Sequence, residues 1–336
     1  MYNFDKFVDR RGTACVKWDV KDLFGVGPDA DLTPMWIADM DFAVVPEIQT
    51  ALKKRCDHPT FGYNTPTPGC VPALCSWYER RHHWKFTPDQ VLNGIGVVTM
   101  IRFTLEALTE PGDKVAVFSP VYDPFFATVH NTNRTLVDLP MNEQNGHYSV
   151  DLAAFEQALK DGVKAVIFCN PHNPIGKVWT KDEVETIGGL CARYGAYMLS
   201  DEVHGDMVMD GNHYNPMGLV DAIQDKLVVY TAISKTFNLA GLHQSAIIIP
   251  NAEVRAKVDA MLKGAWIMGP NLMAFTAMEA AYTYGDKWVD EVTAYISDNV
   301  RYVQQQVHDF MPKVKLSHHE GTFLMWLDLR CLGMSS

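Results

Sequence analysis

The sequence contains no run of about 18 apolar residues, so it has no segment of the kind that spans a membrane as a helix. Its first residues lack the charged and then apolar pattern of a secretion signal. Positive charge is also scarce, with 29 Lys and Arg against 40 Asp and Glu and a net charge of -11. Because phosphate contacts require clustered basic side chains, this balance argues against a nucleic-acid-binding surface. We therefore expect partners other than membranes and nucleic acids.

Cysteine is neither abundant nor patterned. The spacings match no zinc knuckle, so we predict no metal site. Reduced thiols in the cytoplasm are the simplest interpretation of the seven residues, which are Cys15, Cys56, Cys70, Cys75, Cys169, Cys191 and Cys331. No internal repeat or low-complexity tract is visible. With 336 residues, 47% of them hydrophobic, the chain is long enough for a large core, and we expect two unequal domains.

Continuous apolar runs alternate with helical spacing from residue 113 onward. Runs of this kind suit strands buried on both faces of a sheet, and they cover 114–118, 164–168, 196–199, 227–230 and 246–249. Helical spacing covers 151–160 and 181–194. Thr180 and Glu183 form a capping-box pattern before the second helix, and Gly195 suits its end. The alternation predicts an α/β fold with a mostly parallel sheet.

The last third of the chain has a different pattern. Its expected elements are long helices at 271–284 and 286–310, followed by strands at 314–316 and 322–328. We therefore predict a large domain over residues 46–280. A smaller α+β domain would be formed by residues 1–45 and 281–336 together.

Three polar residues come directly after predicted strands: Asn170, Asp201 and Lys235. In parallel sheets, binding sites gather at the carboxyl ends of the strands, so we expect these residues to lie close together. A half-buried ammonium is costly unless it has a partner or a lowered pKa. A lysine with a lowered pKa is able to react with a carbonyl as a nucleophile. Each residue taken alone has an ordinary structural explanation, and it is their combination that predicts a site.

The segments around these residues resemble the fold-type I pyridoxal-phosphate (PLP) enzymes of the aminotransferase class I/II family. They read Ser234-Lys235-Thr236-Phe237-Asn238-Leu239-Ala240-Gly241, Ser200-Asp201-Glu202-Val203-His204 and Asn170-Pro171-His172-Asn173-Pro174. The segment Met35-Trp36-Ile37-Ala38-Asp39-Met40-Asp41-Phe42 is similar to the MalY/PatB branch, whose members are cystathionine β-lyases. The resemblance extends from about residue 3 to 330 and implies a large PLP-binding domain with a mixed, mostly parallel sheet between helices.

The resemblance implies a role for each of the matching residues. Lys235 would hold PLP covalently and, when free, remove the α-proton of the substrate. Asp201 would keep the pyridine nitrogen protonated, Asn173 would donate to the ring 3′-oxygen, and Tyr122 would stack on the ring. His204 stands where many members carry a tyrosine that bonds to the 3′-oxygen.

We expect the PLP phosphate at the start of the helix that begins near Gly96, because helix N-terminal amides attract phosphate. Its predicted contacts are Val98, Thr99, Ser234 and Thr231, and the resemblance adds Tyr63 of a neighbouring subunit. The active unit would therefore be a homodimer.

The chain also departs from the family pattern. Many members carry an arginine eight residues after the lysine, where this sequence has His243, so one partner of the phosphate is absent or weaker. Members usually continue for some tens of residues, in a stretch that carries the arginine for the substrate α-carboxylate. This sequence stops at Ser336, and Arg330 stands in a different motif. We expect the last part of the small domain to be missing, so that PLP binding follows from residues present and catalytic competence depends on that stretch.

Three functions remain open at this point. The first is a carbon–sulfur β-lyase that cleaves cystathionine or a related cysteine conjugate to a thiol, pyruvate and ammonia. The second is a PLP-dependent aminotransferase, which shares the first proton transfer and the same cofactor motifs. The third is a PLP-binding regulatory protein with little turnover. The motifs do not select the natural substrate.

Overall fold

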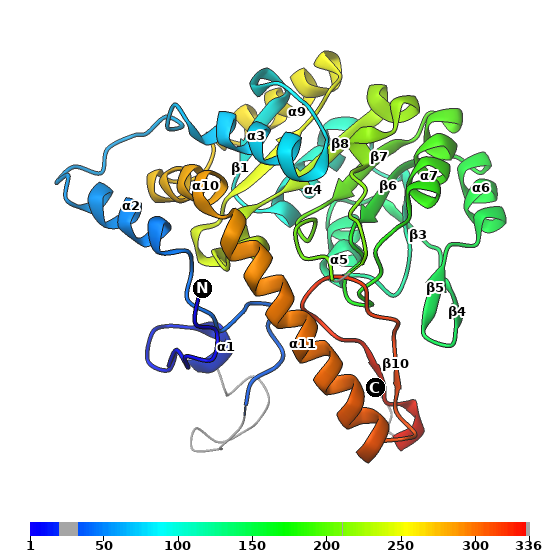
Figure 1. Cartoon of the computed structure of the whole chain (residues 1–336). Helices are drawn as coiled ribbons and strands as arrows, with labels where there is room; N and C mark the ends of the chain where they lie inside the picture. Colours follow the sequence, from blue (N-terminus) through cyan, green and yellow to red (C-terminus); the bar gives the residue numbers. More distant parts are fainter. Residues whose placement is uncertain (20–32, 210, 334–336) are drawn as a thin grey trace.

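The structure is a computed structural model of the chain and describes residues 1–19, 33–209 and 211–333 (Figure 1). Its centre is a seven-stranded sheet with the order β1-β9-β8-β7-β6-β2-β3. The strands are β1 (Val91–Gly94), β2 (Lys114–Val117), β3 (Thr135–Asp138), β6 (Val163–Cys169), β7 (Tyr197–Asp201), β8 (Leu227–Thr231) and β9 (Ser245–Ile248). Strand β9 runs antiparallel to β1 and β8, whereas the other neighbours pair in parallel. The α/β fold with a mostly parallel sheet is therefore confirmed.

Helices cover both faces of this sheet, which explains why its strands are apolar throughout. One face packs against α4 (Val97–Leu108), α5 (Pro124–Asn131) and α9 (Ala252–Gly264). The other face packs against α3 (Cys70–His82), α6 (Leu152–Lys160), α7 (Lys181–Tyr194) and α10 (Leu272–Tyr284). Successive residues point to opposite faces, as Val166 and Ile167 of β6 do. Two apolar cores result, one on each side of the sheet.

The predicted boundaries of α7 are confirmed by its caps. The Glu183 amide donates to Thr180 Oγ1 at 3.2 Å, and the Thr180 amide donates to Glu183 Oε2 at 2.9 Å. Gly195 ends the helix with a left-handed φ of 69°. The helix predicted to start near Gly96 is α4, which Gly96 precedes with a φ of 129°.

The remaining helices and strands belong neither to the seven-stranded sheet nor to the helices named above. They are α1 (Val16–Asp19), α2 (Pro46–Cys56), α8 (Ile233–Thr236), α11 (Asp286–Phe310), and the hairpins β4 (Asn142–Gln144) with β5 (His147–Ser149) and β10 (Lys315–Leu316) with β11 (Leu327–Asp328). Short 3-10 helices occupy Pro88–Gln90, Met217–Leu219, Asp221–Lys226, Ala240–Leu242 and Arg330–Leu332. Across the described residues, no helix has the length and apolar character needed to span a membrane.

The N-terminal segment packs on α11, although nearly the whole chain separates them in sequence (Figure 1). The Phe4 and Trp288 rings lie 5.9 Å apart between centroids, and the Tyr295 hydroxyl donates to Asp5 Oδ1 at 2.8 Å. This is the arrangement expected if both ends of the chain build one smaller domain. The exact division at residues 45 and 280 stays a prediction, and residues 20–32 and 334–336 of the proposed small domain lie outside the described residues.

One predicted strand is wrong for most of its length. Of residues 322–328, only Leu327 and Asp328 pair with β10. Thr322 has a left-handed φ of 67°, which an extended strand does not allow. Its amide donates to the Met207 carbonyl, and Gly321 forms an isolated bridge with Val208, so this part of the chain is bonded to the large domain instead.

Candidate active site

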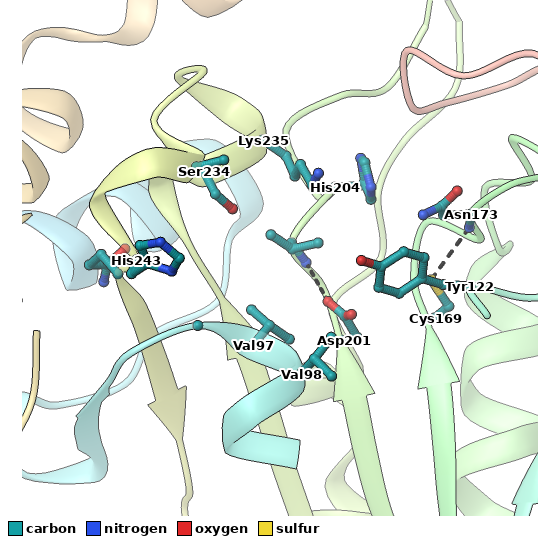
Figure 2. Close-up of a pocket in the computed structure, with 14 residues that line it drawn as sticks. Val97, Val98, Tyr122, Cys169, Asn173, Asp201, His204, Ser234, Lys235 and His243 are labelled. Carbon is teal, nitrogen blue, oxygen red and sulfur yellow. Dashed lines mark hydrogen bonds between the residues drawn. The ribbon is translucent and has the colours of Figure 1, made fainter. Parts of the chain in front are cut away.

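A pocket opens at the carboxyl ends of β6, β7 and β8, beside the N-terminus of α4 (Figure 2). Its volume is about 180 Å³. The lining residues come from most of the segments that the sequence singled out, and they are Gly96, Val97, Val98, Tyr122, Cys169, Asn173, Asp201, Val203, His204, Ser234, Lys235, Ala240, His243 and Gln244. Asp201 and Lys235 therefore meet as the sequence predicted, whereas Asn170 does not line the pocket and its Nδ2 donates to the Asn215 carbonyl at 2.9 Å.

Lys235 reaches the pocket from α8, the single helical turn that follows β8. Its Nζ donates to the Ala38 carbonyl oxygen at 2.6 Å. Burial lowers the pKa of the Lys235 amine, and the negative charge of Asp201 opposes part of that shift. Among the ion pairs of the described residues, none includes this amine. Lys235 is therefore a half-buried amine that loses its proton more readily than an exposed lysine does.

Asp201 is the last residue of β7, and its side chain is 4% exposed. Burial raises the pKa of the Asp201 carboxyl to about 7, while the hydrogen bond that it accepts from the Val203 amide at 3.2 Å acts in the opposite direction. A cation placed in the pocket against this carboxylate would lower the pKa again. The site thus contains an acidic group that lacks a strong positive partner.

The N-terminus of α4 offers free backbone donors to the same pocket. Val97 and Val98 line it, and the first amides of an α-helix have no carbonyl partner within the helix. The Gly96 amide donates to Ser245 Oγ at 3.1 Å, and a Cβ atom on Gly96 would meet nothing within 4 Å. Ser234 also lines the pocket. This end of the pocket is suited to an anion such as a phosphate.

Two of the predicted phosphate contacts do not line the pocket. Thr99 lies one residue further along α4 than the lining residues. Thr231 is 4% exposed and lies beside the phenols of Tyr78 and Tyr282, which belong to the core on the opposite face of the sheet. Alternation along β8 explains this position, because Tyr230 takes the face on which α4 lies.

Tyr122 and Asn173 reach the pocket from two loops that a buried histidine joins. His172 Nε2 donates to the Pro120 carbonyl at 2.9 Å, so it ties the loop before Asn173 to the loop before Tyr122. Burial lowers the pKa of His172 to about 4, which keeps this imidazole neutral near pH 7. The backbone amide of Asn173 donates to Cys169 Sγ at 3.4 Å. The Tyr122 ring is partly exposed at the mouth of the pocket and lies near Asp201 (Figure 2).

His204 is 2% exposed, and neither of its ring nitrogens has a hydrogen-bond partner among the residues that the structure describes. Burial lowers the pKa of His204 to about 3, so the ring is neutral. In Figure 2 the His204 ring and the Lys235 side chain point toward the same space. Phe323 packs against the ring with centroids 5.7 Å apart. A buried polar group without a partner is costly, so these nitrogens are suited to bind a ligand atom in the pocket.

Tyr63 lies on the surface, away from this pocket. Its relative exposure is 112%, and it lies in the segment between α2 and α3. The structure therefore does not bring Tyr63 to the site of its own chain.

Sequence reasoning missed four lining residues: Cys169, Val203, Ala240 and Gln244. Cys169, Val203 and Ala240 lie within five residues of a predicted site residue, so proximity was the only available signal, and Gln244 lies further along the chain, next to His243. Gln244 Oε1 accepts from the Ile233 amide at 3.1 Å and so supports the start of α8. His243, which replaces the family's arginine, does line the pocket.

Glu202, next to Asp201, is 1% exposed and accepts hydrogen bonds from Ser200 Oγ at 2.6 Å, the Met217 amide at 3.0 Å and the Tyr214 hydroxyl. Burial raises the pKa of Glu202 from 4.5 to about 7. Between these values the folded protein binds a proton that the unfolded chain releases, so the contribution of Glu202 to stability falls as pH rises.

Glu202→Gln is therefore expected to flatten the pH dependence of the unfolding free energy between pH 4.5 and about 7. The neutral amide keeps an acceptor for Ser200 and a donor toward the Tyr214 oxygen, but it has no proton to lose. Urea unfolding of the cofactor-free protein at several pH values measures the effect. The matched control is Glu79→Gln, whose side chain is 56% exposed. Equal slopes for wild type and Glu202→Gln would contradict a protonated Glu202.

The residues of this pocket fit PLP. The amine of Lys235 suits its aldehyde, the carboxylate of Asp201 suits a protonated pyridine nitrogen, and the amides at the start of α4 suit its phosphate. The nitrogens of His204 without partners suit a ring oxygen. Within the described parts of the chain, no group of three or more His, Cys, Asp or Glu side chains is arranged to hold a metal ion.

Comparisons with known proteins agree with this geometry. The model of the family "aminotransferase class I and II" matches residues 31–334. Cystathionine beta-lyase PatB of Bacillus subtilis is 42% identical, with 99% of this chain and 86% of the relative covered. Protein MalY of Escherichia coli is 35% identical over 99% of this chain and 85% of its own. A PLP-bound putative aminotransferase from Clostridium difficile has a TM-score of 0.96 and 35% identity, covering 100% of this chain and 86% of that one. The chain therefore belongs to the aminotransferase class I and II family.

Proposed function

We propose that this protein is a PLP-dependent carbon–sulfur β-lyase that cleaves cystathionine or a related cysteine conjugate to a thiol, pyruvate and ammonia. The observation that carries the proposal is the convergence of the Lys235 amine and the buried Asp201 carboxylate beside the start of α4. The similarity to a cystathionine β-lyase over 99% of the chain favours the lyase reaction over other PLP chemistry.

When bound, PLP supplies an electron sink for the electrons of the substrate Cα–H bond. Lys235 holds the cofactor and, in its free form, takes the proton from Cα. Its lowered pKa suits this role, because a base works best with a pKa near the working pH. Asp201 holds the proton on the pyridine nitrogen by its negative charge.

The other residues orient the ring and hold its phosphate. Tyr122 would cover the ring, and Asn173 and His204 would donate to its 3′-oxygen. The amides of Val97 and Val98 and the Ser234 hydroxyl bind the phosphate. We assign the two domains as predicted, with residues 46–280 binding PLP and residues 1–45 and 281–336 forming the smaller domain.

The active unit that we propose is a homodimer in the cytoplasm. Tyr63 and Phe61 are exposed on one segment, and Trp266 and Met268 are exposed on another. Asn64 Nδ2 donates to the Pro270 carbonyl at 3.4 Å, which links the two segments. Large exposed apolar residues that lie close together are typical of a protein interface. The seven cysteines are free, as is usual in a reducing compartment.

Mixing Lys235→Ala with Tyr63→Phe is expected to restore activity if Tyr63 serves the partner's site. In a mixed dimer, one of the two sites has both an intact lysine and an intact tyrosine. Random pairing makes half the dimers mixed, so activity should return to about a quarter of wild type. Each variant is measured alone first, because the test requires that both are severely impaired. Confirmed subunit exchange without recovered activity would contradict a shared site.

The reaction is tested by incubating the PLP-loaded protein with cystathionine and measuring thiol, pyruvate and ammonia. A lyase forms all three without any keto-acid acceptor. An aminotransferase needs the acceptor and leaves the carbon–sulfur bond intact. A protein that binds PLP but produces neither result would be the regulatory alternative, and the proposed activity would then be wrong.

A further inference from the structure

The segment of residues 36–42, here called the strap, is one of the motifs that marked the sequence, yet none of the roles above uses it. In the structure it crosses from the N-terminal part of the chain to the active site. The Ala38 carbonyl is the hydrogen-bond acceptor of Lys235 Nζ at 2.6 Å. The strap therefore contacts the reactive amine directly, and the inference below rests on the proposed role of Lys235.

One side chain holds the strap from within. Asn238 Oδ1 accepts from the Met40 amide at 3.0 Å, and Asn238 Nδ2 donates to the Met40 carbonyl at 2.7 Å and to the Phe42 carbonyl at 3.0 Å. These bonds join residues 196 to 198 positions apart in the chain. Asn238 is three residues after Lys235, so the turn that carries the lysine also carries the group that binds the strap.

The backbone of Asn238 supports a specific role. Its φ is 57°, in the left-handed region that favours glycine. Asparagine is one of the few other residues that tolerate this region, and its side-chain amide offers an acceptor for the Met40 amide together with two N–H donors for the carbonyls of Met40 and Phe42. Glycine would satisfy the backbone without bonding to the strap. An aspartate would satisfy the Met40 amide but would lack the donor that the two carbonyls require.

Charged groups hold the strap from outside. Arg10 donates to Asp39 and Asp41 at 2.8 Å each and to the Met40 carbonyl at 3.1 Å. Lys17 Nζ, on a side chain that is 7% exposed, lies 2.7 Å from Asp41 Oδ2 and donates to the Asp39 carbonyl at 3.0 Å. The two aspartates of the strap thus face basic groups of the N-terminal segment. The side of the strap that faces the active site is instead hydrogen-bonded to Asn238.

We propose that Asn238 is a positioning residue that fixes the strap over the active site, so that the Ala38 carbonyl receives the Lys235 amine whenever that amine is free. A fixed acceptor holds the amine at one place in the pocket. The strap then sets where the Lys235 amine lies, and so how far that amine is from the substrate Cα whose proton it takes. Loss of Asn238 leaves the Lys235 side chain and the PLP-binding residues in place but lets the acceptor move.

The test uses the cofactor-free protein, in which Lys235 is free, and reads amide hydrogen exchange across residues 38–42. Asn238→Gly keeps the left-handed backbone and removes the three side-chain bonds. We expect exchange of the Met40 amide to rise about tenfold or more, as for the loss of one or more hydrogen bonds. The matched control is Asn133→Gly, because exposed Asn133 also has a left-handed φ, of 58°. That control should leave exchange in the strap unchanged.

A double-mutant cycle separates positioning from general loosening. Lys235→Ala removes the bond to Ala38 and should raise exchange in the strap when Asn238 is present, but it should have little further effect in the Asn238→Gly background. In the PLP-loaded enzyme, Asn238→Gly should lower kcat about tenfold while the protein still binds PLP. Unchanged exchange at Met40, or independent effects of the two substitutions, would overturn the proposal. A wild type that forms no pyruvate from cystathionine would instead overturn the proposed function, without altering the exchange result.

Discussion

Replacing Lys235 with alanine is expected to abolish turnover of cystathionine. The substitution removes both the amine that holds PLP and the base that takes the α-proton, and a positioned base alone contributes about 10²- to 10⁴-fold. We therefore expect a loss of at least about 10⁴-fold in kcat, even in preparations where PLP remains bound without a covalent link. The loss in kcat is measured as the steady-state rate of pyruvate formation at saturating cystathionine.

Borohydride reduction of the wild-type protein provides an independent check of the same residue. Reduction should fix the cofactor to the peptide that contains Lys235, with loss of the visible absorption band, and the variant should give no such peptide. The control is Lys226→Ala, because Lys226 lies just before β8, at the opposite end from Lys235. That variant should keep near-normal turnover. Labelling of any other lysine would show that the assignment of Lys235 is wrong.

Asp201→Asn is expected to lower kcat/KM about 10²- to 10³-fold, which corresponds to about 3–4 kcal/mol of transition-state stabilisation. The amide has nearly the volume of the carboxyl group and keeps an acceptor for the Val203 amide. It lacks the charge that holds a proton on the pyridine nitrogen. The buried position makes the effect large, because little water screens that charge.

The control for Asp201 is Asp138→Asn. Asp138 is the last residue of β3, as Asp201 is of β7, so both lie at the carboxyl ends of parallel strands. The Asp138 side chain, however, is exposed and outside the pocket. Its substitution should leave kcat/KM within about twofold of wild type. Near-normal kcat/KM in Asp201→Asn would exclude the proposed role of the carboxylate.

The central strands and the caps of α7 were predictable because their signals are local. A strand covered on both faces is apolar throughout, and a capping box lies within four residues. The edge strands β1 and β3 were not predicted. They read Val-Leu-Asn-Gly and Thr-Leu-Val-Asp, and they are partly exposed, so they lack the continuous apolar run.

The direction in which a side chain points was less predictable than which segments contribute to the site. Whether Thr231 points to the α4 side of the sheet or to the opposite side depends on the rotation of β8 against its neighbours, and a uniformly apolar strand does not reveal that rotation. Contacts between distant segments, such as the Asn238 bonds to the strap, also have no local signature. The positions of Lys235 and Asp201 were predictable because strand ends converge in every parallel sheet.

The bond between Ala38 and Lys235 joins positions 197 residues apart, which affects the order in which the protein is completed during synthesis. The strap leaves the ribosome well before its docking surface, because Lys235 and Asn238 lie nearly 200 residues later in the chain. The N-terminal segment therefore has no surface to dock on while the apolar strands of the sheet are still being synthesised. The closure of the active site is consequently a late event, and the nascent protein is unable to position its reactive lysine before then.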